Sequence, residues 1–133
     1  MSKNWVADIT EMHAKYGVHE WVKNNPEKLE QLLHFRVAFL KEEFDETFKA
    51  TGEKNAEEIV DGLIDLCVVA IGTLDAFGVD PYKAWDAVLK ANMAKVVGVK
   101  PSRPNPLGLP DLIKPEDWSA PDHTGNHGIL PTA

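Results

Sequence analysis

The chain has 133 residues, which is enough for one domain with a sizeable core and too few for two. Its 21 acidic residues outnumber its 14 basic residues, so its surface repels nucleic-acid backbones and we expect no nucleic-acid polymer as a partner. The longest apolar or small run, residues 66–74, is too short to cross a bilayer, and residues 1–30 lack an apolar signal core, so we expect a cytoplasmic protein without a membrane partner.

Helix signals dominate the first part of the chain and predict four helices, at residues 2–16, 25–50, 55–77 and 80–97. Each predicted helix begins at a serine, asparagine or aspartate that can cap it, and a glycine follows each one. At the third start, Asn55 and Glu58 also fit a capping box. No strand pattern is convincing. The sequence therefore predicts an all-α, four-helix bundle-like domain over residues 1–98.

Residues 99–133 differ in composition from the rest of the chain. Seven of the nine prolines fall at or after Pro101, which excludes a long helix or sheet there. We expect an extended, proline-rich tail that packs on the helical body or on a neighbouring subunit. The apolar residues that would anchor it are Leu107, Leu109, Leu112, Ile113 and Trp118.

Asp65 is the only charged residue in an otherwise apolar or small stretch, residues 62–74. A helix that is apolar on all sides is expected to be buried. A carboxylate on such a helix must be neutralised by a cation, a metal ion or a proton, because an unpaired buried charge costs several kcal/mol. Arg36 on the preceding helix could be that cation, and a metal ion is the other interpretation.

Further acids are placed to join Asp65. Glu43 and Glu46 continue the apolar stripe of the second predicted helix, and Asp61 lies one turn before Asp65 on the third. If these two helices pack antiparallel, the four carboxylates meet and repel one another unless Mg²⁺ or Mn²⁺ lies among them. Glu58, one turn earlier, could be a further ligand or only part of the helix cap. A non-catalytic helical protein that binds metal for stability or assembly is the competing hypothesis.

Three short motifs resemble a known family. Glu43-Phe44-Asp45-Glu46 matches a Glu-x-x-Glu element, Asn92-Met93-Ala94-Lys95 matches an Asn-x-x-Lys element, and Asp61 with Asp65 matches the middle element of phage-type members. Residues 58–61 also satisfy Glu-x-x-Asp literally, but Gly62 stands where most relatives carry a glutamate. The chain thus resembles the MazG-like all-α nucleoside triphosphate pyrophosphohydrolases, and most of all the short phage-type members labelled phosphoribosyl-ATP pyrophosphohydrolase-like.

This resemblance implies cleavage of a nucleoside triphosphate between the α and β phosphates, which yields the monophosphate and pyrophosphate. It also implies Mg²⁺ as the cofactor, with Mn²⁺ as a substitute. Glu43 and Glu46 would be catalytic, and Glu46 would accept the proton of the attacking water. The expected metal ligands are Glu43, Glu46, Asp61, Asp65 and, as the alternative to a cap, Glu58.

The resemblance further implies which residues bind the substrate. Asn92 and Lys95 would contact phosphate or sugar. Other residues must hold the base, and the candidates in the sequence are His13, Lys15, Tyr16, His34, Phe35 and Trp118. Arg36 is a further candidate for substrate binding. The expected substrate is a purine nucleotide, dGTP or GTP, with dUTP, dCTP or phosphoribosyl-ATP as alternatives. The expected assembly is a homodimer or homotetramer, and a phage-encoded member would act in the host cytoplasm.

Overall fold

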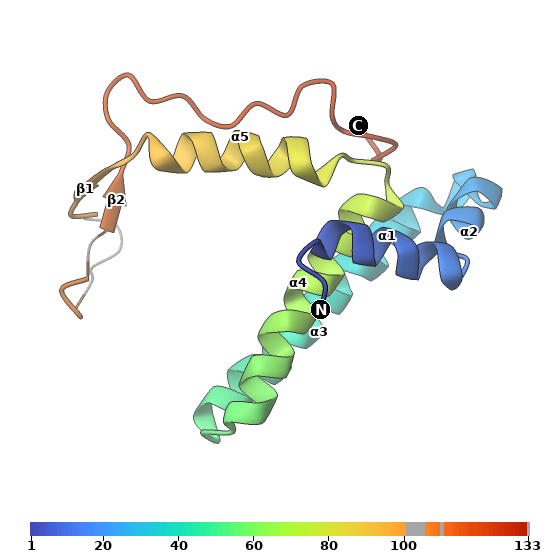
Figure 1. Cartoon of the computed structure of the whole chain (residues 1–133), viewed down its shortest axis with the longest axis horizontal. Helices are drawn as coiled ribbons and strands as arrows, with labels where there is room; N and C mark the ends of the chain where they lie inside the picture. The colour runs from blue at the N-terminus through green and yellow to red at the C-terminus, as the bar shows by residue number, and fades with distance from the viewer. Residues whose placement is uncertain (101–105, 110, 133) are drawn as a thin grey trace. The chain divides into compact units, whose positions relative to one another are not determined.

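The computed structural model describes residues 1–100, 106–109 and 111–132 (Figure 1). Within these residues the chain forms five α-helices, a 3-10 turn at Pro26–Lys28 and two short strands. This confirms the all-α fold class, with five helices where four were predicted. The elements are α1 (Trp5–Lys15), α2 (Val18–Asn24), α3 (Leu29–Gly52), α4 (Ala56–Ala76), α5 (Pro81–Met93), β1 (Val96–Gly98) and β2 (Asp111–Ile113).

The described chain divides into two compact units. The first contains residues 1–81 together with the chain from His127 onward, and the second contains residues 82–126. The predicted domain boundary at residue 98 stays a prediction.

One prediction about the N-terminal region is wrong, and one helix there was not predicted. Asn4 caps α1 instead of Ser2, since the Ala7 N–H donates to Asn4 Oδ1 over 2.9 Å. In addition, Gly17 does not only end α1. Its φ of 77° lies in the left-handed region that favours glycine, and α2 begins directly after it. A helix of seven residues is too short to show a clear apolar period, so α2 could not be predicted from the sequence.

Helices α3 and α4 form an antiparallel hairpin, and they lie side by side in Figure 1. The Glu58 N–H donates to Asn55 Oδ1 over 3.2 Å, which confirms the predicted cap of α4. The two helices approach closely at Gly62, where an added Cβ would overlap the hydroxyl of the buried Thr47. Gly62 therefore sets a short spacing between α3 and α4 at the level where the acids stand.

The core of the first unit is centred on Phe77, whose side chain is fully buried against Val22, Ala76 and Val79. The end of the chain completes this core. Leu130 packs against it, and the Ile129 N–H donates to the Phe77 carbonyl over 2.8 Å. The predicted anchors of the tail did not include these residues.

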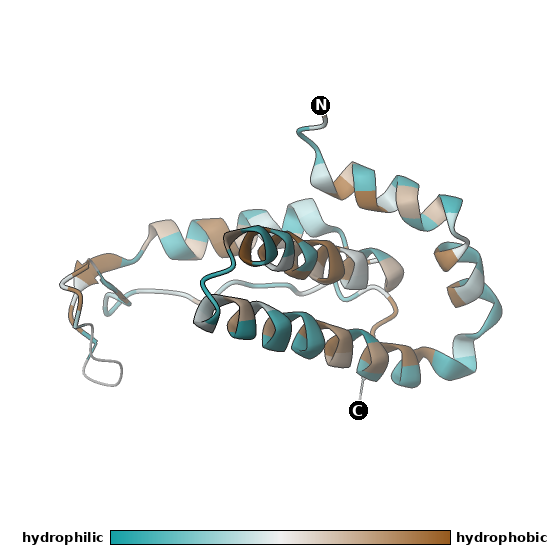
Figure 2. Cartoon of the chain, turned by 90° about the horizontal axis from the view of Figure 1, so that it is seen from below, coloured by the Kyte–Doolittle hydropathy of each residue, from teal (hydrophilic) through white to brown (hydrophobic). Residues whose placement is uncertain are grey.

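Helix α4 carries the most apolar surface of the hairpin, as Figure 2 shows, but one chain buries only part of it. Gly62, Val69, Gly72 and Ala76 are buried, whereas about half of the surface of Leu63 is exposed. The prediction of a helix buried on all sides is thus wrong for the single chain. No single helix in the described part of the chain is long and apolar enough to span a membrane, and α4 and α5 reach the required length and composition only as a pair across the break between them.

The second unit joins α5 to the tail. Helix α5 ends at Met93, earlier than predicted, because the β-branched run that follows enters β1 and pairs antiparallel with β2. The absence of strands was therefore predicted wrongly. Trp118 anchors the tail on α5, where its indole Nε1–H donates to the Ala91 carbonyl over 2.7 Å. Leu107 and Leu109 are exposed and bury little.

Candidate active site

The hairpin brings the predicted acids together in the first unit. Glu43 from α3 and Asp65 from α4 are half-buried and line one pocket of about 380 Å³. Glu46 and Asp61 are exposed, and their charges act on Glu43. The antiparallel packing thus places both acid pairs on one side of the hairpin.

The burial and crowding of these acids raise the pKa of two of them, Glu43 and Asp65. Burial raises the pKa of Glu43, and the charges of Asp65, Glu46, Glu42 and Asp61 raise it further. Burial also raises the pKa of Asp65, together with the charge of Asp61 and a hydrogen bond between these two carboxyl groups. A bound divalent cation would reduce the mutual repulsion of these carboxylates.

The donor set consists of carboxylate oxygens alone, which suits Mg²⁺ or Mn²⁺ better than zinc. The side chains of these acids are spread along one side of the hairpin. The group whose ligand atoms converge within 4.8 Å in the described chain is instead His13, His19 and Asp75. Both imidazole groups of that trio already bind the carboxylate, so we favour the acids as the metal-binding set.

Glu58 stands apart from the other acids. Its side chain is exposed, its backbone N–H receives the cap from Asn55, and it is not among the charges that raise the pKa of Glu43. The hydrogen bond from the Glu58 N–H to Asn55 therefore supports the helix-cap interpretation directly, whereas a role of Glu58 as a metal ligand stays a prediction.

Arg36 lines the same pocket as Glu43 and Asp65. Its Nε donates to Thr73 Oγ1 and its Nη2 to the Val69 carbonyl, each over 3.0 Å, so the guanidinium is fixed against α4. Burial lowers its pKa. Arg36 forms no salt bridge with a carboxylate among the described residues, so it does not neutralise Asp65 as one interpretation held. The pocket thus holds a positioned cation beside the acids.

Of the three candidates at the end of α1, His13, Lys15 and Tyr16, only His13 lines this pocket. His13 is buried, and its Nδ1 lies 2.8 Å from Asp75 Oδ2. Lys15 is exposed, with its ammonium 5.3 Å from the ring centroid of Tyr16, and it does not line the pocket.

Asn92 and Lys95 belong to the second unit. Asn92 is exposed in the last turn of α5, and its carbonyl accepts the Lys95 N–H over 3.2 Å. The Lys95 ammonium lies 5.6 Å from the ring centroid of Trp118. Their contact with phosphate or sugar stays a prediction.

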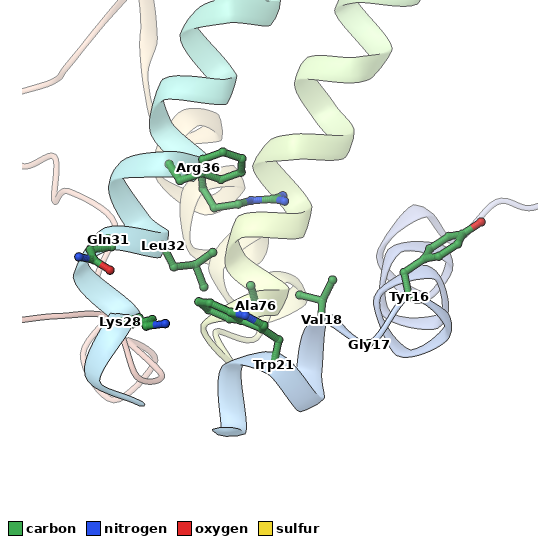
Figure 3. Close-up of a pocket in the computed structure, with 10 residues that line it drawn as sticks. Tyr16, Gly17, Val18, Trp21, Lys28, Gln31, Leu32, Arg36 and Ala76 are labelled. Carbon is green, nitrogen blue, oxygen red and sulfur yellow. The ribbon is translucent and has the colours of Figure 1, made fainter. Parts of the chain in front are cut away.

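A larger pocket of about 620 Å³ was not predicted from the sequence. In Figure 3 the Trp21 indole from α2 lies below Leu32 of α3, and the Arg36 guanidinium points toward α4. Gln31 and Lys28 border the pocket on the α3 side. Arg36 lines both pockets, so they are neighbours. Because α2 was not predicted, the sequence offered no reason to place Trp21 here.

Comparison with known proteins adds a family to this geometry. Residues 18–92, more than half of the chain, match the family model described as phosphoribosyl-ATP pyrophosphohydrolase. No curated protein and no solved structure matches the chain. The family belongs to the MazG-like all-α NTP pyrophosphatase superfamily and is generally dependent on divalent metal. The match spans α2 to the last turn of α5 and includes Glu43, Glu46, Asp61 and Asp65. The chain therefore belongs to the phosphoribosyl-ATP pyrophosphohydrolase family and is a hydrolase that acts on acid anhydrides.

Proposed function

We propose that the chain is a Mg²⁺-dependent pyrophosphohydrolase that cleaves a nucleoside triphosphate between its α and β phosphates. The observation that carries this proposal is the pocket that Glu43, Asp65 and Arg36 line together. A polyphosphate substrate requires acids that bind its divalent cation and a positioned cationic group that binds its phosphates, and this pocket offers both.

In this proposal Glu43, Glu46, Asp61 and Asp65 hold Mg²⁺, or Mn²⁺ in its place. The bound ion would offset the negative charge on the phosphate oxygens. Glu46 accepts one proton of the attacking water as the water oxygen bonds to the α phosphorus. The bond from this phosphorus to the bridging oxygen breaks, and pyrophosphate leaves with the bond electrons. Arg36 donates to phosphate oxygens and loses none of its protein contacts.

The larger pocket is the place for the nucleobase. Its volume of about 620 Å³ lies within the range of small-molecule sites, and its lining combines aromatic rings with a few polar groups. Trp21 offers an apolar face for stacking, and Gln31 offers an amide that can hydrogen-bond a base edge. The pocket is large enough for a purine, and dGTP or GTP remains the proposed substrate on the strength of the phage-type resemblance.

The experiment that tests this proposal is a nucleotide panel with Mg²⁺, with chromatographic separation of the products. The four ribo- and four deoxyribonucleoside triphosphates, dUTP and phosphoribosyl-ATP are compared, each with an EDTA control. We expect monophosphate and pyrophosphate in equal amounts, no diphosphate, and fastest turnover of dGTP or GTP. A preference for dUTP, dCTP or phosphoribosyl-ATP would replace the purine assignment. No turnover with Mg²⁺ or Mn²⁺ would leave a non-catalytic metal-binding protein as the better interpretation.

We also infer that the chain forms a homodimer or homotetramer through an apolar face of the hairpin. This hairpin face consists of Phe44, Phe48 and Leu63, which are between 51% and 69% exposed. At 3.6 residues per turn, Phe48 of α3 and Leu63 of α4 fall on the side of the hairpin opposite Glu46 and Asp61. A second copy of the chain is the proposed occupant, since it brings an equally apolar surface and leaves the acidic side open.

Phe48→Glu is expected to lower the molar mass measured by light scattering to that of a single chain. The cause is the cost of burying a carboxylate among the apolar side chains of the partner. Val99→Glu makes the same change at a residue that is 83% exposed in the second unit, and it should keep the assembly. A wild-type chain that is monomeric at micromolar concentration would contradict the inference.

A further inference from the structure

A hydrogen-bonded cluster in the first unit has no part in the chemistry proposed above. Asp75 of α4 accepts three hydrogen bonds from α1 and α2. Thr10 Oγ1 lies 2.7 Å from Asp75 Oδ1, while His13 Nδ1 and His19 Nε2 lie 2.8 Å and 2.6 Å from Oδ2. The Asp75 and His13 side chains are only 11% and 5% exposed, whereas His19 is 38% exposed. One carboxylate therefore fixes two histidines in different surroundings.

The carboxylate determines where the proton of His13 resides. Burial alone would raise the pKa of Asp75, but the hydrogen bonds from Thr10, His19 and His13 outweigh this effect and lower it. An ionised carboxylate can only accept hydrogen bonds, so Nδ1 of His13 carries the hydrogen. Burial lowers the pKa of His13, and the Arg36 charge acts in the same direction, although Asp75 opposes both. At neutral pH the Nε2 atom of His13 thus presents a lone pair.

That lone pair lies next to the pocket that Glu43, Asp65 and Arg36 line, here called the acid pocket. His13 and Arg36 both line the pocket with Glu43 and Asp65. A Cβ placed on Gly72 would lie 3.1 Å from His13 Nε2 and 2.5 Å from Arg36 Nη2, so both side-chain ends meet at this glycine. No residue in the described part of the chain donates a hydrogen bond to Nε2 of His13. His19 shares the same carboxylate oxygen but does not line the pocket.

We propose that Asp75 is a positioning residue, which holds His13 as a hydrogen-bond acceptor for an O–H group of the bound substrate complex. The O–H group belongs either to the attacking water or to a sugar hydroxyl. This assignment rests on the proposed function, because it takes the acid pocket as the place where the substrate binds. In this assignment both imidazole nitrogens that face Asp75 carry hydrogens, so the trio acts as a hydrogen-bonded cluster rather than as a metal site.

The test compares substitutions around the same carboxylate. His13→Leu removes the acceptor and is expected to lower kcat/KM at least about tenfold. His13→Gln, whose amide oxygen can accept, should recover part of the loss. Asp75→Asn lets an amide N–H donate to Nδ1, which moves the imidazole hydrogen to Nε2 and turns the acceptor into a donor. It should therefore lose as much activity as His13→Leu. His19→Leu is the matched control and should change kcat/KM less than about threefold, because its ring does not reach the pocket.

Substrates with different sugars identify the O–H group. If a sugar hydroxyl is the donor, removing that hydroxyl from the substrate lowers kcat/KM for the wild type and has little further effect in His13→Leu. If the attacking water is the donor, His13→Leu lowers kcat by the same factor for GTP, dGTP and 2′,3′-dideoxy-GTP, and KM changes little.

Nuclear magnetic resonance of ¹⁵N-labelled protein gives a measurement that a purely structural role of Asp75 would not move. In the wild type we expect a hydrogen on Nδ1 and a bare Nε2 for His13, and the reverse in Asp75→Asn. Equal losses of activity in His19→Leu and His13→Leu would overturn the proposal, and so would a hydrogen on Nε2 in the wild type. If the wild type hydrolyses no nucleotide, the proposed function fails, and the position of the His13 hydrogen still decides the role of Asp75.

Discussion

Asp65→Asn is expected to abolish pyrophosphohydrolase turnover, with a loss of at least about 100-fold, while the chain stays folded. The amide keeps the shape of the side chain but loses the charge that binds a divalent cation. Asp65 shares its pocket with Glu43 and Arg36, so its loss affects the centre of the proposed site. The measurement is monophosphate release under Mg²⁺, accompanied by circular dichroism to confirm the helical content.

The same substitution is expected to keep or raise the melting temperature in EDTA. Burial and the Asp61 charge raise the pKa of Asp65, so the folded chain binds this proton more tightly than the unfolded chain does. The stabilisation from the protonated group is then present at low pH and declines as the pH rises through the ordinary range of an aspartate and up to the raised pKa. At neutral pH the ionised Asp65 therefore destabilises the folded chain, and substitution by asparagine removes this destabilising charge.

Added Mg²⁺ should raise the melting temperature of the wild type and not that of Asp65→Asn, because an ion that binds only the folded chain stabilises it by mass action. Asp45→Asn is the matched control. This aspartate is exposed on α3 and pairs with Lys41 over 2.7 Å, so its loss should cost less than about 0.5 kcal/mol and leave turnover intact. Near-normal activity in Asp65→Asn would show that the metal site lies elsewhere.

Phe77→Ala is expected to destabilise the first unit by about 3–5 kcal/mol, the usual cost of removing a buried phenylalanine side chain. Phe77 is fully buried, and Val22, Ala76, Val79 and Leu130 surround it, so the ring leaves a cavity that residues from several elements would have to fill. Urea unfolding monitored by circular dichroism measures the change in the free energy of unfolding.

The control for this substitution is Trp5→Ala, which removes a larger side chain from a residue of α1 that is 54% exposed. We expect it to cost much less than Phe77→Ala. A loss below about 1 kcal/mol in Phe77→Ala would mean that the cluster around this ring does not limit the stability of the first unit.

The hairpin and its acids were predictable because local signals determine them. The cap at Asn55 and the spacing of Asp61 and Asp65 can be read within one or two turns of helix. The prediction that Glu43 faces Asp65 needed only the assumption that a short connection makes the two helices antiparallel. The structure brings these residues into one pocket, and their role as metal ligands is the part that Asp65→Asn tests.

The elements that were missed depend on contacts between distant residues. Asp75 lies 62 residues from His13 and 56 from His19, and no spacing rule joins residues that far apart. The burial of α4 was predicted from its composition, but composition does not say whether the same chain or a partner covers an apolar face. The strand pair was also not predicted, since three residues in β1 and three in β2 are too few to show alternation.

The return of the chain end to α4 has a consequence for how such proteins can vary. Because the Ile129 N–H binds the Phe77 carbonyl, residues 78–128 form a loop that is closed at its base. The entropy of closing a long loop grows only with the logarithm of its length, by about 0.6 kcal/mol for each doubling. The part of this loop beyond the family match, residues 93–128, could therefore change in length at little cost to the acid-bearing hairpin.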